Sequence, residues 1–168
     1  GNPKGVMLEH RNLLALIDSQ KQDGLLTFNQ RVLQFATHSF DVCYQEIFST
    51  LLAGGCLYII DEQLKKDADY LLAFIKNANI DTVFLPTAYL KFLFSVPERL
   101  EQIPDCLAHI ITAGEQLLVS PTLRRYLQNC NVLLHNHYGP SETHVVSTQV
   151  LSRYTALDDI PAIGKPVA

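Results

Sequence analysis

The residues of this chain best suited to chemistry lie in one string of eight, Asn136-His137-Tyr138-Gly139-Pro140-Ser141-Glu142-Thr143. An aromatic ring such as Tyr138 can stack on a nucleobase. The hydroxyls of Ser141 and Thr143 can hydrogen-bond phosphate oxygens, and a carboxylate such as Glu142 can hold Mg²⁺ between phosphates. Gly-Pro alone would indicate an ordinary turn. The whole string instead predicts a binding site for a magnesium-bound nucleotide.

A second candidate is Asp41, which follows Phe40 and directly precedes a segment with helical periodicity. Position alone favours a helix N-cap. The alternative is a carboxylate that pairs with the α-ammonium group of an amino acid. Such a partly buried pair discriminates strongly, because an analogue without the amine leaves the aspartate unpaired. Gln45, one turn further along, is expected above the same face of the helix.

Three histidines, His135, His137 and His144, raise the question of a transition-metal site. The H-x-H pair places two rings on one face of a strand, as many metal sites require. The remaining ligands are not supplied at the usual spacing by a cysteine, an aspartate or a second H-x-H pair. We therefore assign no transition metal to these histidines.

The elements that must position these residues are short apolar runs rich in β-branched and aromatic side chains. They begin at residues 32, 56, 82, 109 and 132, which is 24, 26, 27 and 23 residues apart, and they read as strands over 32–37, 56–61, 82–87, 109–114 and 132–138. Segments with helical periodicity separate them, at 41–52, 68–76, 89–94 and 121–127, after a first helix at 12–20. This alternation predicts an α/β fold with a mostly parallel sheet and flanking helices.

Two details of this pattern are specific enough to check. The runs are nearly continuous in apolar residues, as burial on both faces of a sheet requires. In the segment 41–52 we expect an apolar face formed by Ile47, Phe48, Leu51 and Leu52. After Tyr138 the pattern changes, with one more strand expected at 145–150 and polar loop beyond it.

Ligands of open parallel sheets bind outside the carboxyl ends of the strands. The chemically unusual residues do follow the strands, at 37–41, 113–115 and 136–143. We therefore expect three loops from separate strands to converge on one crevice.

Composition narrows the class of protein. Hydrophobic residues make up 48% of the 168 residues and charged residues 18%, which suits a folded core. The net charge of −4 and the scattered basic residues argue against a nucleic-acid partner. No apolar stretch reaches 18 residues and no signal peptide opens the chain, so we expect a cytoplasmic protein without a membrane span. Both ends consist of loop residues, and we expect sequence to be missing on both sides.

The string 136–143 resembles the N-x-Y-G-P-T-E signature of adenylate-forming enzymes, with Ser141 in place of the usual threonine. The segment 1–5 resembles the end of that family's phosphate loop, and the segment 163–166 resembles its I-G-x-P loop. Phe40-Asp41 resembles the F-D signature of members that activate amino acids. The chain is most similar to adenylation domains of nonribosomal peptide synthetases. On this resemblance, 1–168 is a partial AMP-binding domain from the large N-terminal subdomain, without the start of the phosphate loop and the C-terminal subdomain.

The resemblance implies a role for each motif residue. Glu142 would bind Mg²⁺, and the family's catalytic lysine would lie beyond residue 168. The ATP- or AMP-binding residues would be Lys4, Gly114, Glu115, Asn136, Tyr138, Gly139, Ser141 and Thr143. The substrate pocket would be formed by Asp41, Val42, Gln45, Phe84, Ile111, Ala113, His137, Val145 and Val146. These side chains by themselves predict a small apolar substrate. The resemblance of the pocket to that of proline-activating domains implies that the substrate is L-proline.

The implied reaction uses Mg·ATP to convert the amino acid to aminoacyl-AMP. The acyl group would then pass to the phosphopantetheine thiol of a peptidyl carrier protein, with a condensation domain as a further partner. The 168 residues alone would be inactive. Two alternatives stay open: an acyl- or aryl-acid CoA ligase of the same superfamily, against which Asp41 argues, and a non-catalytic binding module.

Overall fold

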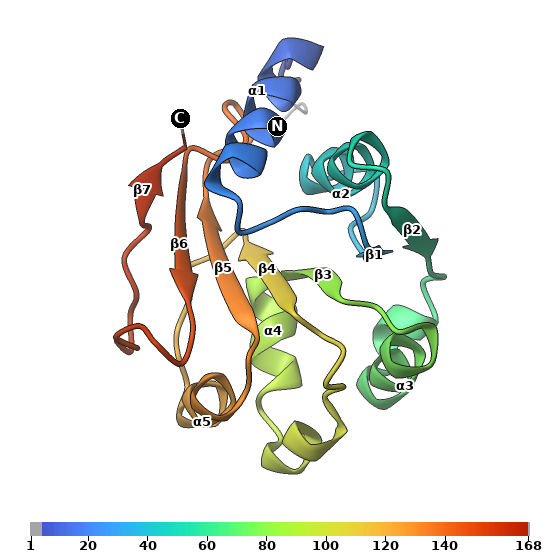
Figure 1. The fold of residues 1–168 in the computed structure, drawn as a ribbon, viewed down its shortest axis with the longest axis vertical. Coiled ribbons are helices and arrows are strands. Elements are labelled where there is room, and N and C mark those ends of the chain that lie inside the picture. Colours follow the sequence, from blue (N-terminus) through green and yellow to red (C-terminus); the bar gives the residue numbers. More distant parts are fainter. Residues whose placement is uncertain (1–4, 168) are drawn as a thin grey trace.

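The structure is a computed structural model that describes residues 5–167. A seven-stranded sheet with the order β2-β1-β3-β4-β5-β6-β7 runs through it (Figure 1). The pairings among β1 to β5 are parallel, and the pairings β5–β6 and β6–β7 are antiparallel, which confirms the predicted mostly parallel sheet. The strands are β1 (Arg31–Gln34), β2 (Cys56–Ile59), β3 (Thr82–Pro86), β4 (His109–Ala113), β5 (Leu133–Tyr138), β6 (Ser147–Leu151) and β7 (Lys165–Pro166).

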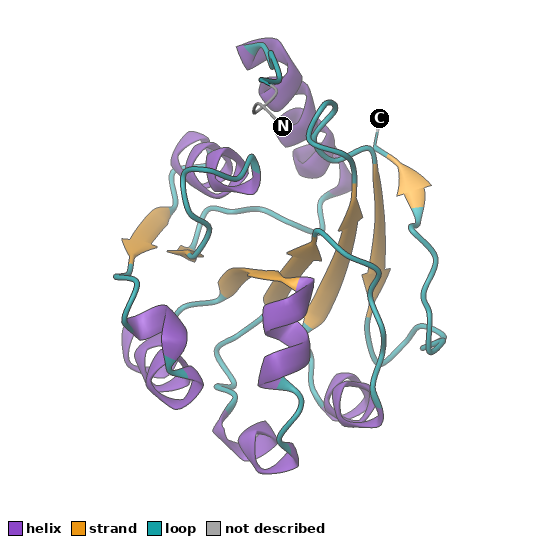
Figure 2. Ribbon diagram, turned by 180° about the vertical axis from the view of Figure 1, so that it is seen from behind, coloured by secondary structure: helices purple, strands orange, loops and turns teal. Residues whose placement is uncertain are grey.

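Helices cover both faces of this sheet (Figure 2). They are α1 (His10–Asp23), α2 (Val42–Leu52), α3 (Ala68–Ala78), α4 (Thr87–Leu93) and α5 (Pro121–Asn129), with short 3₁₀ turns at Leu64–Lys66 and Pro97–Gln102. Local signals set some of their ends. The Ser120 hydroxyl accepts a hydrogen bond from the backbone N–H of Leu123 and so caps α5, as the Ser-Pro sequence predicts. Helix α1 ends at Gly24, which adopts the left-handed conformation that glycine tolerates.

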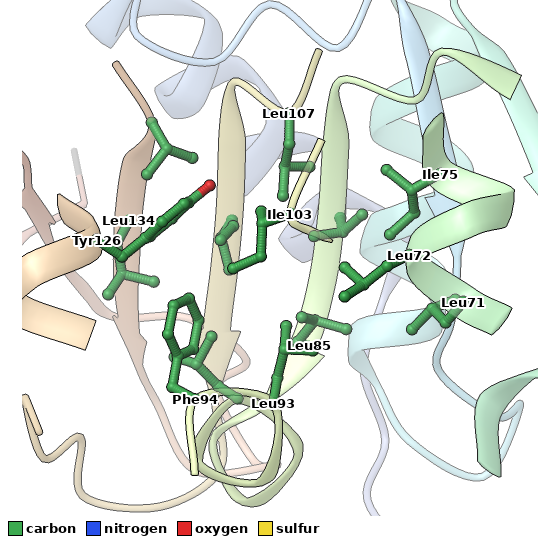
Figure 3. Packing of buried hydrophobic residues seen from close by; sticks show 14 of the residues in the cluster. Leu71, Leu72, Ile75, Leu85, Leu93, Phe94, Ile103, Leu107, Tyr126 and Leu134 are labelled. Atoms are coloured by element: carbon green, nitrogen blue, oxygen red, sulfur yellow. The ribbon is translucent and has the colours of Figure 1, made fainter. Parts of the chain in front are cut away.

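The alternation of side chains along the strands divides the core in two. Leu33, Val83, Ile110 and Leu134 point to the larger core, which α3, α4 and α5 cover. Figure 3 shows side chains of these three helices meeting residues of β3 and β5. The opposite face carries a smaller cluster of Val32, Phe84 and Ile111 with Leu26 and Phe28, against which Val42 of α2 packs. The predicted substrate pocket belongs to this second face.

The predicted apolar face of α2 is wrong. The buried residues of the helix are Cys43, Gln45, Glu46, Ser49 and Thr50. Phe48, Leu51 and Leu52 instead are exposed. The reason is the buried carboxylate of Glu46, which accepts hydrogen bonds from the backbone N–H groups of Phe35 and Ala36. Buried backbone donors need partners, so the polar side of α2 faces the end of β1.

The same contact explains why β1 ends at Gln34 and not at residue 37 as predicted: the next two backbone N–H groups bond to Glu46 rather than to a strand.

Burial on both faces is also a wrong expectation for β2, which lies at the edge of the sheet with Ile59 78% exposed. The strand expected at 145–150 is β6, which begins two residues later, and the polar loop beyond it contains the short strand β7. Within residues 5–167, the helices are all too short or too polar to cross a bilayer.

Candidate active site

The loops that carry the predicted site residues leave one edge of the sheet. Because β1, β4 and β5 are parallel, their carboxyl ends lie at the same edge. The loops 37–41, 113–115 and 136–143 begin there. Two features connect them: a cavity between the second and third loops, and a hydrogen bond between the first loop and the residue that follows the third. The second and third loops thus form one crevice, and the first loop contacts the residue that follows the third loop without lining the cavity.

The cavity has a volume of about 390 Å³, within the range of small-molecule sites. Its lining includes five of the residues predicted to bind nucleotide: Gly114, Glu115, Asn136, Tyr138 and Gly139. The Tyr138 side chain is 49% exposed, which leaves its ring accessible to a ligand. Four further lining residues were not predicted as site residues, namely Gln116, Leu117, Pro161 and Ile163. Ile163 was within reach of sequence reasoning, because it opens the I-G-x-P match.

Close backbone packing shapes the walls of this cavity. The side-chain amide of Asn136 donates a 3.1 Å hydrogen bond to the carbonyl oxygen of Ala162, which holds the wall formed by Pro161 and Ile163. Gly139 has no room for a side chain, because a Cβ atom there would lie 1.6 Å from the carbonyl oxygen of His144. Gly114 has a φ of 105°, a conformation that favours glycine.

Ser141, Glu142 and Thr143 form an exposed turn next to this cavity and are not part of its lining. The Thr143 hydroxyl lies within hydrogen-bond distance of the carbonyl oxygens of Pro140 and His144. Glu142 makes no ion pair with a described residue. One free carboxylate beside two hydroxyls fits Mg²⁺, which takes one or two protein carboxylates together with phosphate oxygens and water. Lys4 lies outside the described residues.

The substrate-pocket residues on the strands share one face of the sheet. Phe84 is in register with Ile111, and Ile111 with His135, so the face that carries Ile111 also carries Ala113 and His137. Val42 of α2 packs against the cluster that contains Phe84 and Ile111. Val145 and Val146 are half-buried in the connection to β6 and are not part of that cluster.

Asp41 caps α2 incompletely. Its Oδ1 accepts a 2.8 Å hydrogen bond from the adjacent backbone N–H of Val42, and its φ and ψ of −58° and −34° are helical rather than extended. An ordinary N-cap reaches the second or third residue of the helix. The other carboxylate oxygen makes no hydrogen bond with the described residues, and the side chain forms no ion pair with them. The N-cap interpretation thus accounts for one of the two carboxylate oxygens.

Gln45 and His137 are buried with unpaired polar atoms. Both side-chain amide atoms of Gln45 and the Nδ1 atom of His137 lack a hydrogen-bond partner among residues 5–167. Burial, and secondarily the neighbouring His144, lowers the pKa of His137 to about 3, so its ring is neutral at pH 7. Unpaired buried polar atoms are unusual and mark places where a ligand or water supplies the partner.

His135 of β5 bonds to another histidine of the protein. His135 lies on the same face as His137, as the H-x-H spacing predicts, and its Nε2 lies 3.1 Å from Nδ1 of His109. Within residues 5–167, no group of three or more histidine, cysteine, aspartate or glutamate side chains is placed to hold a metal ion.

Sequence reasoning missed two residues of this region. Glu46 fastens α2 to the end of β1, and it is the only charged residue in the helix, a signal that was available. Burial raises its pKa to about 7 against the opposing effect of its hydrogen bonds. His144 was considered only as a metal ligand. Its Nε2 atom lies 3.2 Å from the backbone carbonyl oxygen of Asp41, and no local pattern indicates a contact between residues 103 positions apart.

Comparison with known proteins identifies the family of this chain. The family model of the AMP-binding enzyme matches residues 1–168. The chain is 49% identical over 168 residues to gramicidin S synthase 2 of Brevibacillus brevis and 50% identical over 168 residues to tyrocidine synthase 2 of Brevibacillus parabrevis. Both matches cover 100% of this chain. The chain spans only 4% and 5% of the length of these relatives.

Solved structures share the fold. The adenylation domain AlmE of Vibrio cholerae, in complex with glycyl-adenosine-5'-phosphate, has a TM-score of 0.79 at 23% identity, over 99% of this chain and 31% of that one. The N-terminal subdomain of NpsA from Klebsiella oxytoca, in complex with 3-hydroxybenzoyl-AMSN, has a TM-score of 0.80 at 24% identity, over 99% and 42%. The architecture is that of the N-terminal subdomain of adenylate-forming enzymes.

Proposed function

Because this chain belongs to the family of AMP-binding enzymes, we propose that it contributes the nucleotide and amino acid sites of an amino-acid-activating domain in a nonribosomal peptide synthetase. The observation that carries the proposal is the placement of Asp41. Its backbone is hydrogen-bonded to the residue that follows the 136–143 loop, and that loop lines the 390 Å³ cavity. A carboxylate suited to an amine thus lies at the same edge of the sheet as a cavity suited to a nucleotide.

The reaction is attack of the amino acid carboxylate on the α-phosphorus of ATP. A bond forms between a carboxylate oxygen and that phosphorus, the bond to the bridging oxygen of the β-phosphate breaks, and pyrophosphate leaves. Tyr138 stacks on the adenine, while Ser141 and Thr143 contact the α-phosphate. Glu142 would hold Mg²⁺, which when bound would supply positive charge beside the phosphates. Rate acceleration comes from placing the two reactants together and from stabilising developing charge.

Asp41 selects substrates that carry an amine. The carboxylate oxygen that Val42 leaves unpaired accepts the α-ammonium group of the amino acid. Phe84, Ile111 and Val42 form an apolar floor for a compact side chain. L-proline suits this pocket, since it brings a small ring and an ammonium group. Gln45 and His137 add polar atoms that have no partner in the protein.

The activity belongs to the complete protein of which these 168 residues are one part. The catalytic lysine and the remainder of the domain lie elsewhere in that protein, and the isolated segment is inactive. The aminoacyl group passes to the phosphopantetheine thiol of a peptidyl carrier protein, and a condensation domain then uses it.

Pyrophosphate exchange by the complete protein tests this proposal against a panel of amino acids, fatty acids and aryl acids. Exchange that depends on proline, and that falls at least tenfold in Asp41→Ala, is the expected result; a factor of ten corresponds to about 1.4 kcal/mol of lost binding. Exchange only with acids that lack an α-amine would favour the acyl- or aryl-acid ligase, and Asp41→Ala would then have little effect. Absence of exchange with every acid would favour a non-catalytic binding module.

A further inference from the structure

We propose that His144 is a positioning residue, which holds the amine-binding Asp41 at a fixed place relative to the nucleotide-binding loop. The proposal rests on the function proposed above for Asp41. His144 is outside the set of residues predicted to touch either substrate. It lies between the loop 136–143 and β6. Its side chain is hydrogen-bonded to the backbone of Asp41 at the start of α2 and so connects the two segments.

The hydrogen bonds of His144 define its tautomer. The backbone N–H of Val145 donates to Nδ1 of the ring at 2.9 Å, so Nδ1 is an acceptor. The proton of the neutral ring is therefore on Nε2, which donates to the carbonyl oxygen of Asp41 at 3.2 Å. Both ring nitrogens have partners, and the residue is buried. A ring held at both nitrogens can fix the position of the backbone that it contacts.

The backbone of His144 is held in an unfavourable conformation. Its φ of 60° lies in the left-handed region, which glycine and asparagine adopt more readily than histidine. The backbone of Gly139 packs closely against that of His144, because a Cβ atom at Gly139 would lie 1.6 Å from the carbonyl oxygen of His144. Strain of this kind persists only where the surrounding structure enforces it, and it concentrates at functional sites.

The contact acts on the first turn of α2. The carbonyl oxygen of Asp41 also accepts the first helical hydrogen bond, from the backbone N–H of Tyr44 at 3.0 Å. The Asp41 side chain is in turn bonded to Val42. His144 thus tethers the end of the helix from which the Asp41 carboxylate projects. Loss of the tether should let that carboxylate move relative to Tyr138, and reactions between two bound groups are sensitive to displacements of about 1 Å.

Three substitutions separate the donor from the shape of the ring. His144→Phe keeps the ring and removes both nitrogens. In His144→Gln the side-chain amide nitrogen reaches about as far as Nε2 and restores the donor. His144→Asn accepts the positive φ more readily but is too short to reach Asp41. Neither Phe nor Gln is favoured at a positive φ, so these two variants compare a ring without a donor and a donor without a ring at similar backbone strain.

The test is pyrophosphate exchange by the complete protein, with KM measured separately for proline and for ATP. We expect His144→Phe and His144→Asn to raise the KM for proline about tenfold, the effect of one hydrogen bond, and to change the KM for ATP less than about twofold. His144→Gln should recover most of the loss. Equal increases in both KM values, no increase in either, or a Gln variant no better than Phe would refute the positioning role. If His144→Phe does not fold, His144→Asn decides.

A double-mutant cycle with Asp41→Asn separates this proposal from the proposed function. If His144 acts through Asp41, adding His144→Phe to Asp41→Asn should raise the KM for proline little further. Additive effects would refute positioning through Asp41. If Asp41→Asn itself leaves the KM for proline unchanged, the amine-binding function is wrong, and the positioning role that depends on it fails too. If Asp41→Asn raises that KM and His144→Phe does not, only the positioning role fails.

Discussion

The backbone N–H of Ala36 lies 3.0 and 3.1 Å from the two carboxylate oxygens of Glu46. One of these oxygens also accepts the N–H of Phe35, and the Gln34 side-chain amide approaches the other at 3.4 Å. A buried carboxylate therefore terminates β1 and orients α2, the helix that carries Asp41 and Gln45. Thr50 on the same face donates to the backbone carbonyl oxygen of Glu46, so it offers a matched site without a charge.

We expect the stability of the protein to report the titration of Glu46. Burial raises its pKa from 4.5 to about 7. A pKa that is higher in the folded state contributes stability fully present below pH 4.5 and lost as the pH rises through 7. Relative to Glu46→Gln, the wild-type free energy of unfolding should fall by roughly 3 kcal/mol over that interval. Urea unfolding at several pH values between 4.5 and 8 measures it.

Thr50→Val is the control for this titration, because it removes a buried hydroxyl and leaves the carboxylate in place. It should lower the free energy of unfolding by about 1 kcal/mol at every pH, and that free energy should change with pH as it does in the wild type. Parallel pH profiles for wild type and Glu46→Gln would mean that Glu46 does not titrate in this range.

His137 should give the opposite pH dependence. Its pKa is lowered from 6.5 to about 3, chiefly by burial, so the ring stays neutral in the folded protein. Its contribution to stability is present above pH 6.5 and is lost as the pH falls toward 3. Below pH 6.5 the wild type should lose about 1.4 kcal/mol per pH unit relative to His137→Leu. Circular dichroism can monitor the acid unfolding of both proteins. If wild type and His137→Leu unfolded with the same pH profile, the proposed contribution of His137 would be wrong.

Asn136 should affect nucleotide binding alone. Its amide donates to the carbonyl oxygen of Ala162 and so holds the wall of the cavity that includes Pro161 and Ile163. Asn136→Asp replaces the donor with an acceptor that repels that carbonyl. We expect the KM for ATP in the complete protein to rise about tenfold and the KM for proline to stay within about twofold.

Asn129→Asp provides the comparison for Asn136→Asp. Its amide donates to the carbonyl oxygen of Arg125 at the exposed end of α5, and it does not line the cavity. It should leave both KM values unchanged. A rise in the KM for proline equal to that for ATP in Asn136→Asp would show that the two sites are not separable in this way.

Gly139→Ala should distort the loop between Tyr138 and His144. The added Cβ would meet the carbonyl oxygen and carbon of His144 at 1.6 and 2.6 Å, both of them backbone atoms. Forcing such a contact costs about 1–3 kcal/mol, and we expect pyrophosphate exchange to fall by a factor of about ten to a hundred. Normal exchange by Gly139→Ala would show that this loop does not shape the site.

The parallel sheet and the order of its loops could be predicted from sequence because both depend on local patterns. Apolar runs such as 109–114 identify buried strands wherever they occur. Parallel strands place their carboxyl ends together, so the meeting of the loops after β1, β4 and β5 follows from the pattern alone. The proposed roles of the string around Tyr138 and of the pair Phe40-Asp41 likewise rest on residues that are neighbours in the chain.

Only the tertiary structure decided which partners the polar groups take. The periodicity of α2 favoured burial of Leu51 and Leu52, but Glu46 had backbone donors to satisfy at the end of β1, so the helix turned its polar side inward. The contact of His144 with Asp41 spans 103 residues and leaves no trace in either local sequence. Periodicity reports how residues a few positions apart share a face. Hydrogen bonds between distant segments depend on how the whole chain closes, so they become visible only in the folded protein.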